Sequence, residues 1–133
     1  MKKPSLTSLG ETEMEVLHHV WDLGEARVND VRDRILEERD IAYTTVMTVM
    51  KKLAEKGYLT YRKDGRSYVY RPARSQSDVQ HSLLQRLMEK VFGGSPTALV
   101  QTLVQREDLS DEDRRELKAL IHRMAEDDDR SDS

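Results

Sequence analysis

The chain has 133 residues, of which 35% are charged, 37% hydrophobic and 5% aromatic. This length suits one compact domain, or a small domain with an appendage. No cysteine is present, which excludes a disulfide scaffold, a thiolate metal site and a cysteine nucleophile. No apolar run approaches the roughly 20 residues that span a bilayer, and the N-terminus lacks a signal-peptide core. We therefore expect a cytoplasmic protein without membrane insertion.

The formal net charge of −3 is unevenly distributed along the chain. Residues 1–43 carry a net charge of −4, residues 44–74 carry +6, and residues 75–133 carry −5. A short cationic block inside an acidic chain is typical of a surface that binds a polyanion. A solvated helix and hairpin that happen to carry lysines and arginines would give the same count. Charge alone leaves both interpretations open.

Apolar residues at helical spacing predict three helices in the first part of the chain. They cover 11–23, 29–39 and 45–56. Asn29 is expected to cap the second of them, because its side chain can accept a hydrogen bond from a free backbone N–H. Trp21, on the first helix, is expected to anchor the core rather than to bind a ligand.

The hydrophobic period then changes to that of strands. Residues 58–63 and 67–71 are rich in aromatic and β-branched side chains, and Asp64-Gly65 between them is a strong signal for a short hairpin turn. Three short helices followed by a hairpin are the order of a winged helix-turn-helix. We therefore predict a mainly α fold with a small β-hairpin, in which residues 1–74 form a winged-helix DNA-binding domain.

Amphipathic helices return after residue 74, and no strand pattern recurs. We predict a three-helix dimerisation domain at 75–126 and a disordered acidic tail at 127–133. Helices this short seldom bury a core of their own, so their apolar stripes need another surface. A second copy of the segment is the favoured partner, giving a two-fold homodimer, and packing back onto the N-terminal domain is the alternative. The predicted dimerisation residues are Leu83, Leu87, Val91, Leu99, Leu103, Leu117, Leu120, Ile121 and Met124.

The outer face of the third predicted helix carries threonines and then lysines. The major groove of B-DNA admits an α-helix, in which threonines can contact base edges and lysines can neutralise phosphates. The hairpin carries further cations beside a turn that could reach an adjacent minor groove. Alternatively, Thr44 or Thr45 only caps the helix and Thr48 is an idle surface residue. The predicted DNA-binding residues are Thr44, Thr45, Met47, Thr48, Lys51, Lys52, Arg62, Lys63 and Arg66.

Three hairpin tyrosines allow two interpretations. Tyr61, Tyr68 and Tyr70 could stack on the bases of a single strand, as aromatic side chains do in single-strand binders. Strand tyrosines at alternating positions more often pack against neighbouring helices. We favour packing for all three.

Catalysis and metal binding find little support in the sequence. None of the four histidines pairs with another at the i, i+4 spacing of a helical zinc site. No nucleophile elbow, glycine-rich phosphate loop or dinucleotide-binding fingerprint occurs. We therefore predict no catalytic residue, no metal site, no cofactor and no enzymatic activity.

Three stretches of the sequence resemble a known family. They read LGETEMEVLHHVW, AYTTVMTVMKKLAEKGYLTYRKDGRSYVYRP and LMEKVFGGSPTALVQTLVQREDLSDEDRRELKALI. They closely resemble the penicillinase-repressor transcriptional regulators, a family that includes BlaI, MecI and CopY. The resemblance covers Leu9 to Met124, and its most specific parts are the TTVMTV string and the Gly93-Gly94 break.

The resemblance implies a homodimeric repressor on a palindromic operator of double-stranded DNA. In the best-known members a membrane-bound protease sensor responds to β-lactam, and the repressor is cut in the helix after the Gly-Gly break. The corresponding bond here is Thr102–Leu103, where the family pattern has Asn-Phe, so the same cleavage preference does not follow. Thr44 and Met47 stand where the lactam-responsive repressors have long basic side chains, which implies a different operator.

One alternative of another class remains at this stage. Winged helices also serve as protein-interaction modules, in which the wing and the third helix contact a partner protein without specific DNA readout. The acidic charge outside residues 44–74 is compatible with that role. Retention on duplex DNA at low salt, lost at high salt, would separate the two functions.

Overall fold

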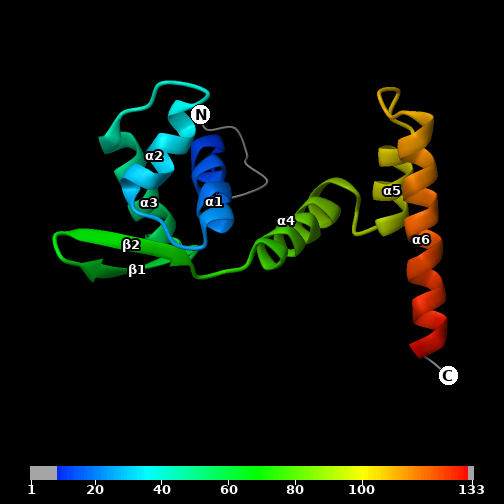
Figure 1. The fold of residues 1–133 in the computed structure, drawn as a ribbon. Helices are drawn as coiled ribbons and strands as arrows, with labels where there is room; N and C mark the ends of the chain where they lie inside the picture. The colour runs from blue at the N-terminus through cyan, green and yellow to red at the C-terminus, as the bar shows by residue number, and fades with distance from the viewer. Residues whose placement is uncertain (1–8, 132–133) are drawn as a thin grey trace. The chain divides into compact units, whose positions relative to one another are not determined.

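The computed structural model describes residues 9–131, which form six helices and one two-stranded sheet. Residues up to Leu87 and residues from Met88 onward form two compact units. A mainly α fold with a small hairpin is thus confirmed. The elements are α1 (Glu11–Leu23), α2 (Val28–Leu36), α3 (Tyr43–Glu55), β1 (Leu59–Asp64), β2 (Ser67–Pro72), α4 (Gln76–Val91), α5 (Pro96–Val104) and α6 (Asp111–Ser131) (Figure 1).

Helices α2 and α3 begin earlier than the sequence pattern predicts. The N-cap of α2 is Arg27, whose backbone N–H donates to the Asp30 carboxylate at 2.8 Å. The prediction that Asn29 caps this helix is therefore wrong, because Asp30 sits three residues after the N-cap and reaches back to it. The N-cap of α3 is Ala42, and no side chain caps that helix. A capping role for the threonines at its start is wrong as well.

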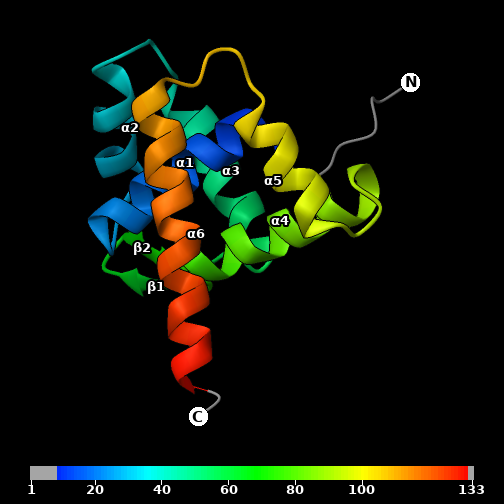
Figure 2. The ribbon, with the colours of Figure 1, turned by 90° about the vertical axis from the view of Figure 1, so that its right-hand side faces the viewer.

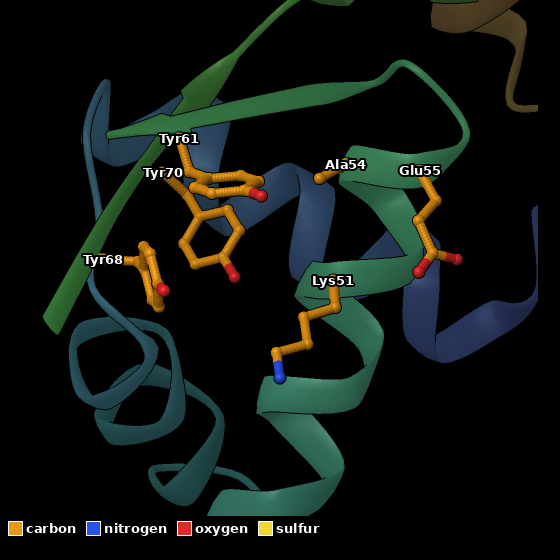
Figure 3. Close-up of a pocket in the computed structure, with 6 residues that line it drawn as sticks. All are labelled: Lys51, Ala54, Glu55, Tyr61, Tyr68 and Tyr70. Carbon is orange, nitrogen blue, oxygen red and sulfur yellow. The ribbon is translucent and has the colours of Figure 1, made fainter. Parts of the chain in front are cut away.

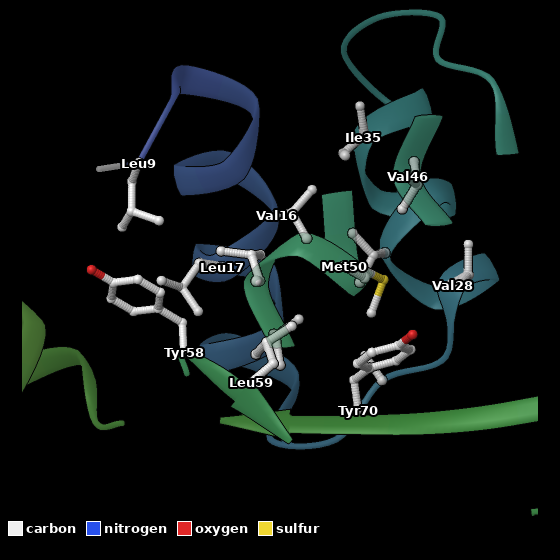
Figure 4. Close-up of a cluster of buried hydrophobic side chains, with 14 of the residues drawn as sticks. Leu9, Val16, Leu17, Val28, Ile35, Val46, Met50, Tyr58, Leu59 and Tyr70 are labelled. Atoms are coloured by element: carbon white, nitrogen blue, oxygen red, sulfur yellow. The ribbon is translucent and has the colours of Figure 1, made fainter. Parts of the chain in front are cut away.

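Helices α1, α2 and α3 and the hairpin enclose one apolar core (Figure 4). Trp21 packs against this core, as expected, and its indole N–H donates to the Arg74 carbonyl oxygen at 3.1 Å. Val79, from α4, is also a buried member of the core. The core side chains labelled in Figure 4 are Leu9, Val16, Leu17, Val28, Ile35, Val46, Met50, Tyr58, Leu59 and Tyr70.

The hairpin is antiparallel, with a two-residue turn between Asp64 and Ser67. Gly65, the first turn residue, has a φ of 65°, which is the left-handed region that glycine adopts without steric cost. Backbone hydrogen bonds of 2.8 Å in both directions join Tyr70 on β2 to Ala26, before α2. This third short strand segment ties the hairpin to the helices and completes the winged helix.

The unit from Met88 onward has no fully buried side chain between residues 88 and 126. Ser95 caps α5 by accepting a hydrogen bond from the backbone N–H of Ala98 at 3.1 Å. The guanidinium of Arg114, on α6, donates to the carbonyl oxygens of Val104 at 3.1 Å and Arg106 at 2.9 Å. These bonds fix the turn between the two helices (Figure 2). Apolar side chains of α5 and α6 remain exposed within the single chain.

Two boundaries differ from the sequence interpretation. Val79 and Leu83 pack with the N-terminal core, and the first compact unit extends to Leu87, beyond the predicted division after residue 74. Helix α6 continues to Ser131, into the predicted tail, and neither glycine nor proline occurs within it to interrupt it. The last two residues of that tail lie outside the described residues.

Candidate nucleic-acid interface

One side of α3 is exposed. It carries hydroxyl groups first and ammonium groups further along the helix. Its buried residues, Val46, Met50 and Leu53, face the core. The exposed side therefore presents the hydroxyls at its N-terminal end and the cations in the following turns. The exposed side chains are Thr44, Thr45, Thr48, Lys51 and Lys52.

Met47 occupies an edge of this surface rather than its centre. It is partly buried, packs against the core, and lines a groove with Lys51 and Tyr68. Its thioether can therefore contact a ligand only along one side. The sequence pattern predicts Met47 on or near the outer face together with the threonines, whereas the structure has it partly buried.

The predicted wing cations do not all share one face of the hairpin. Lys63 lies opposite Tyr68 in the register, whereas Arg62 lies opposite Val69, on the other face. Arg66 is in the turn, at the tip. All three are exposed, so the hairpin presents cations on two faces and at its end.

Some cations of the +6 block form ion pairs with carboxylates of the protein, and others do not. Arg62 donates to the Glu25 carboxylate at 2.8 and 3.4 Å, and this hydrogen bond, followed by the carboxylate charge, raises the pKa of Arg62. Lys56 pairs with Glu13 at 2.8 Å. Within residues 9–126, the cations of the +6 block that have no carboxylate partner are Lys51, Lys52, Lys63, Arg66 and Arg71.

A second pair fixes the tip of the wing. The guanidinium of Arg27 donates to the Asp64 carboxylate at 2.5 Å and to the Ser67 hydroxyl, on the two sides of the turn. Together with the pair formed by Arg62, this contact holds the hairpin against the segment between α1 and α2. The wing is thus braced before any nucleic acid is bound.

The three hairpin tyrosines have different environments. Tyr70 is buried in the core, as the packing interpretation predicts. That interpretation is wrong for Tyr61 and Tyr68, whose exposed fractions are 55% and 42%. The rings of Tyr61 and Tyr68 meet edge to face, with centroids 5.2 Å apart. Tyr61 lies opposite the buried Tyr70, yet every residue of β1 after Leu59 is exposed, so the strand period alone does not bury every tyrosine on this face.

A groove of about 400 Å³ separates these tyrosines from α3 (Figure 3). A second groove, of about 300 Å³, shares Lys51, Tyr68 and Tyr70 with it. Sequence reasoning singled out Lys51 and the tyrosines separately but did not bring them together. The alternation of 61, 63, 68 and 70 onto one face was the available signal.

The described part of the chain has neither a membrane-spanning helix nor a cluster of metal ligands. No helix within residues 9–131 is long and apolar enough to cross a bilayer. Among the side chains the structure describes, no three histidine, cysteine or acidic groups come together as metal ligands.

Comparison with known proteins gives a family and several relatives. The penicillinase repressor family model matches residues 9–123. The methicillin resistance regulatory protein MecI of Mammaliicoccus sciuri is 27% identical over 115 residues, which are 86% of this chain and 94% of that protein. The transcriptional regulator BlaI of Mycobacterium tuberculosis is 34% identical over 103 residues, 76% of this chain and 75% of that protein.

A solved structure is also similar. It is the monomeric form of Bacillus licheniformis BlaI in complex with the blaP half-operator, which is 27% identical. The match covers 56% of this chain and 90% of that chain, with a TM-score of 0.46.

Proposed function

The chain belongs to the penicillinase repressor family of DNA-binding transcriptional regulators, and we propose that it represses transcription as a homodimer on a palindromic operator. One observation carries the assignment of the DNA-binding surface. The exposed side of α3 presents three threonines and then two lysines, and neither lysine has a carboxylate partner in the described part of the chain. Unpaired lysines are free to neutralise phosphates.

In the proposed complex, α3 enters the major groove with its N-terminal end closest to the bases. Thr44, Thr45 and Thr48 then face base edges or the backbone, while Lys51 and Lys52 face phosphates. Lys63 and Arg66 of the wing contact the neighbouring backbone. Met47 touches the DNA from the edge of this surface, and Arg62 contacts it only if its pairing with Glu25 is exchanged for a phosphate.

Dimerisation through the C-terminal helices is part of the proposal. It is supported by apolar side chains that remain exposed in the single chain, such as Leu103 at 37% and Leu120 at 45%. Two copies related by a two-fold axis would cover these faces and place two recognition helices on one duplex. Half-sites are then expected about one helical turn apart, ~10 bp, or a small multiple of it.

We further propose that proteolysis in α5 relieves repression in response to β-lactam or cell-wall stress, through a membrane-bound protease sensor. The candidate bond, Thr102–Leu103, lies in the last part of this helix, where the Thr102 hydroxyl donates to the Ala98 carbonyl oxygen at 2.9 Å. A protease must unwind this turn, and helices of such length are marginal by themselves. A cut there would divide the dimerisation surface, and each monomer would lose the avidity that the second half-site supplies.

Capture of genomic DNA tests the repressor function. The purified chain is mixed with sheared genomic fragments in dilute buffer, and the retained fragments are sequenced. We expect a small set of fragments that share an inverted repeat, released as the salt concentration rises. Retention of random fragments, or of none, would contradict a specific operator. The Lys52→Gln variant, which keeps α3 and the core, should retain fewer fragments of the same set.

A protein-interaction module without DNA readout is not favoured, because the relatives are transcriptional regulators. The same membership supports a role without enzymatic activity. Since a repressor acts where its operator is, the expected location is the compartment that holds the DNA, which in a bacterial relative is the cytoplasm.

A further inference from the structure

The groove between α3 and the hairpin has features of a ligand site that DNA binding alone does not require. Its volume of about 400 Å³ lies in the range of small-molecule pockets, ~300–1,000 Å³. The lining combines three aromatic rings with one cation. The lining residues are Lys51, Ala54, Glu55, Tyr61, Tyr68 and Tyr70 (Figure 3).

Tyr70 provides a hydrogen-bond donor that has no protein partner among the described residues and lines this groove. Only 2% of the residue is exposed, and its hydroxyl has no hydrogen-bond partner among the described residues. The hydroxyl oxygen itself is not sealed from solvent, because it is not among the buried polar atoms that lack a partner, so it can donate to water or to a ligand in the groove. Burial first, and then the neighbouring tyrosines, raise the pKa of Tyr70, so the hydroxyl keeps its proton at neutral pH and can donate it to a bound acceptor.

Lys51 gives the groove its charge. Its ammonium group has no carboxylate partner within residues 9–126 and points into the space in front of the tyrosines (Figure 3). Glu55 also lines the groove, but its carboxylate points away from the rings (Figure 3). An ammonium and a phenolic O–H that converge on one space recognise an anion.

The arrangement of the tyrosine rings determines which shape of anion fits the groove. The centroids of Tyr61 and Tyr68 are 5.2 Å apart at an interplanar angle of 86°, and those of Tyr61 and Tyr70 are 5.5 Å apart at 45°. Rings arranged in this way offer both a face and an edge to a flat aromatic guest. An inorganic anion has no ring, so it would gain no binding free energy from contact with these tyrosine rings.

We propose that this groove binds a small planar aromatic anion, a benzoate-like carboxylate, whose charged group meets Lys51 and the Tyr70 hydroxyl. Since Lys51 also belongs to the proposed DNA-binding face, the bound anion neutralises a phosphate contact and weakens operator binding. This second step rests on the proposed function, whereas binding of the anion does not. The groove is thereby an effector site on the recognition helix.

A DNA phosphate is the competing occupant of the same groove. It would use the same ammonium and hydroxyl donors, since tyrosines and lysines both contact the backbone of DNA. The aromatic walls favour the carboxylate, because they contribute binding only to a ligand with a ring. The two occupants therefore differ in whether a ring improves binding.

A set of matched probes tests the proposal without DNA. Benzoate is titrated into the full chain and followed by NMR shifts of the tyrosine rings, beside benzamide, cyclohexanecarboxylate, acetate and inorganic phosphate. We expect saturable binding of benzoate that is about tenfold tighter than that of each other probe. Equal affinity for benzamide or acetate, or no binding at all, would overturn the proposal. Stronger binding of phosphate would overturn it in favour of a backbone contact.

Three variants locate the site. Tyr70→Phe keeps the ring and removes the hydroxyl, and we expect benzoate affinity to fall about fivefold. Lys51→Gln should lower it about tenfold, and Lys52→Gln, one position along on α3, should leave it unchanged. Circular dichroism and thermal melting identify any variant that fails to fold. Unaltered benzoate affinity in both folded groove variants would contradict the assignment.

A competition experiment tests the effect on DNA. At constant ionic strength, saturating benzoate should weaken duplex binding about fivefold or more, while benzamide at the same concentration should not. Binding of benzoate without any change in duplex affinity would refute the regulatory step. A chain that binds benzoate but no duplex would refute the repressor function and leave the anion site standing.

Discussion

The guanidinium Nη1 of Arg62 lies 2.8 Å from Oε1 of Glu25, across the space between the wing and the segment before α2. The side chain that sequence reasoning assigned to DNA is thus engaged within the protein. Glu25 precedes Ala26, whose backbone pairs with Tyr70, so the ion pair and the backbone bridge brace the same part of the hairpin. An exposed ion pair contributes little to stability. Its main consequence is that it limits how readily Arg62 can contact DNA.

Removing this carboxylate is expected to strengthen DNA binding. In Glu25→Gln the guanidinium of Arg62 is released toward phosphate, so we expect about two- to threefold tighter binding and one additional counterion in the salt dependence, ~0.9 in slope. Fluorescence anisotropy of a labelled duplex at several salt concentrations measures both. Asp22→Asn is the matched control, because Asp22 pairs with Arg34 at 3.2 Å on the helices. Equal effects of the two variants would argue against a contact by Arg62.

Loss of the two unpaired lysines of α3 is expected to weaken binding to all sequences. The double variant Lys51→Ala, Lys52→Ala removes two phosphate contacts, so the slope of log affinity against log salt should flatten by ~1.8. Lys56→Ala is a suitable comparison, since that ammonium already pairs with Glu13 at 2.8 Å. An unchanged slope in the double variant would contradict phosphate contact by α3.

The order of the elements was predictable because each has a local cause. The helical period of α1 and α3 and the Asp64-Gly65 turn specify their elements without help from the rest of the chain. The winged-helix fold followed from that order. Helix starts were less predictable, because a cap depends on which of several polar side chains reaches the free N–H groups, and at α2 this is Asp30 rather than Asn29.

The candidate site was predictable only in part. The helical period fixes which side of α3 is exposed, so the threonines and lysines were found from the sequence. Pairing between distant residues cannot be derived from a local period, and the contact of Arg62 with Glu25 therefore came only from the structure. The groove beside Lys51 lies between α3 and the hairpin tyrosines, and the tertiary packing that leaves Tyr61 exposed opposite the buried Tyr70 cannot be derived from the strand period.

Thr48 is expected to set sequence preference rather than overall affinity. It is the exposed threonine nearest to the lysines, and a hydroxyl on a base edge discriminates between base pairs. In Thr48→Ala we expect relaxed preference at one base pair in each half-site, worth ~1 kcal/mol, with an unchanged salt slope. Selection from a randomised duplex library measures this. Identical selected sequences for the variant and the parent chain would exclude direct readout by Thr48.

Replacing two apolar residues of α6 should separate the protomers. Leu120 and Ile121 have exposed fractions of 45% and 48% in the single chain, so a change to serine removes little from its own core. We expect the double variant to sediment as a monomer at micromolar concentration and to bind a single half-site. Leu36→Ser, with 39% exposure on α2, is the control and should leave the dimer intact. A dimeric double variant would show that the protomers meet elsewhere.

Tyr70 is expected to make the N-terminal unit sensitive to alkali. Because burial and then the adjacent tyrosines raise its pKa, the folded chain holds this proton more tightly than the unfolded chain. The contribution of this difference to the free energy of unfolding is fully present below the pKa of the unfolded chain, about 10. It is lost as the pH rises through the raised pKa of the folded chain. Between those values the free energy of unfolding falls by up to ~1.4 kcal/mol per pH unit from this group.

Urea unfolding followed by the fluorescence of Trp21, the single tryptophan, measures this loss from pH 9 upward. In Tyr70→Phe the alkaline fall should be smaller, while stability at pH 7 changes by less than ~1 kcal/mol, because the hydroxyl has no partner to lose among the described residues. Tyr61→Phe removes one neighbouring phenol but leaves Tyr70 buried, so it should retain most of the alkaline loss, because burial is the larger cause of the raised pKa. If Tyr70→Phe and the parent chain lost stability in parallel above pH 10, Tyr70 would not be the group responsible.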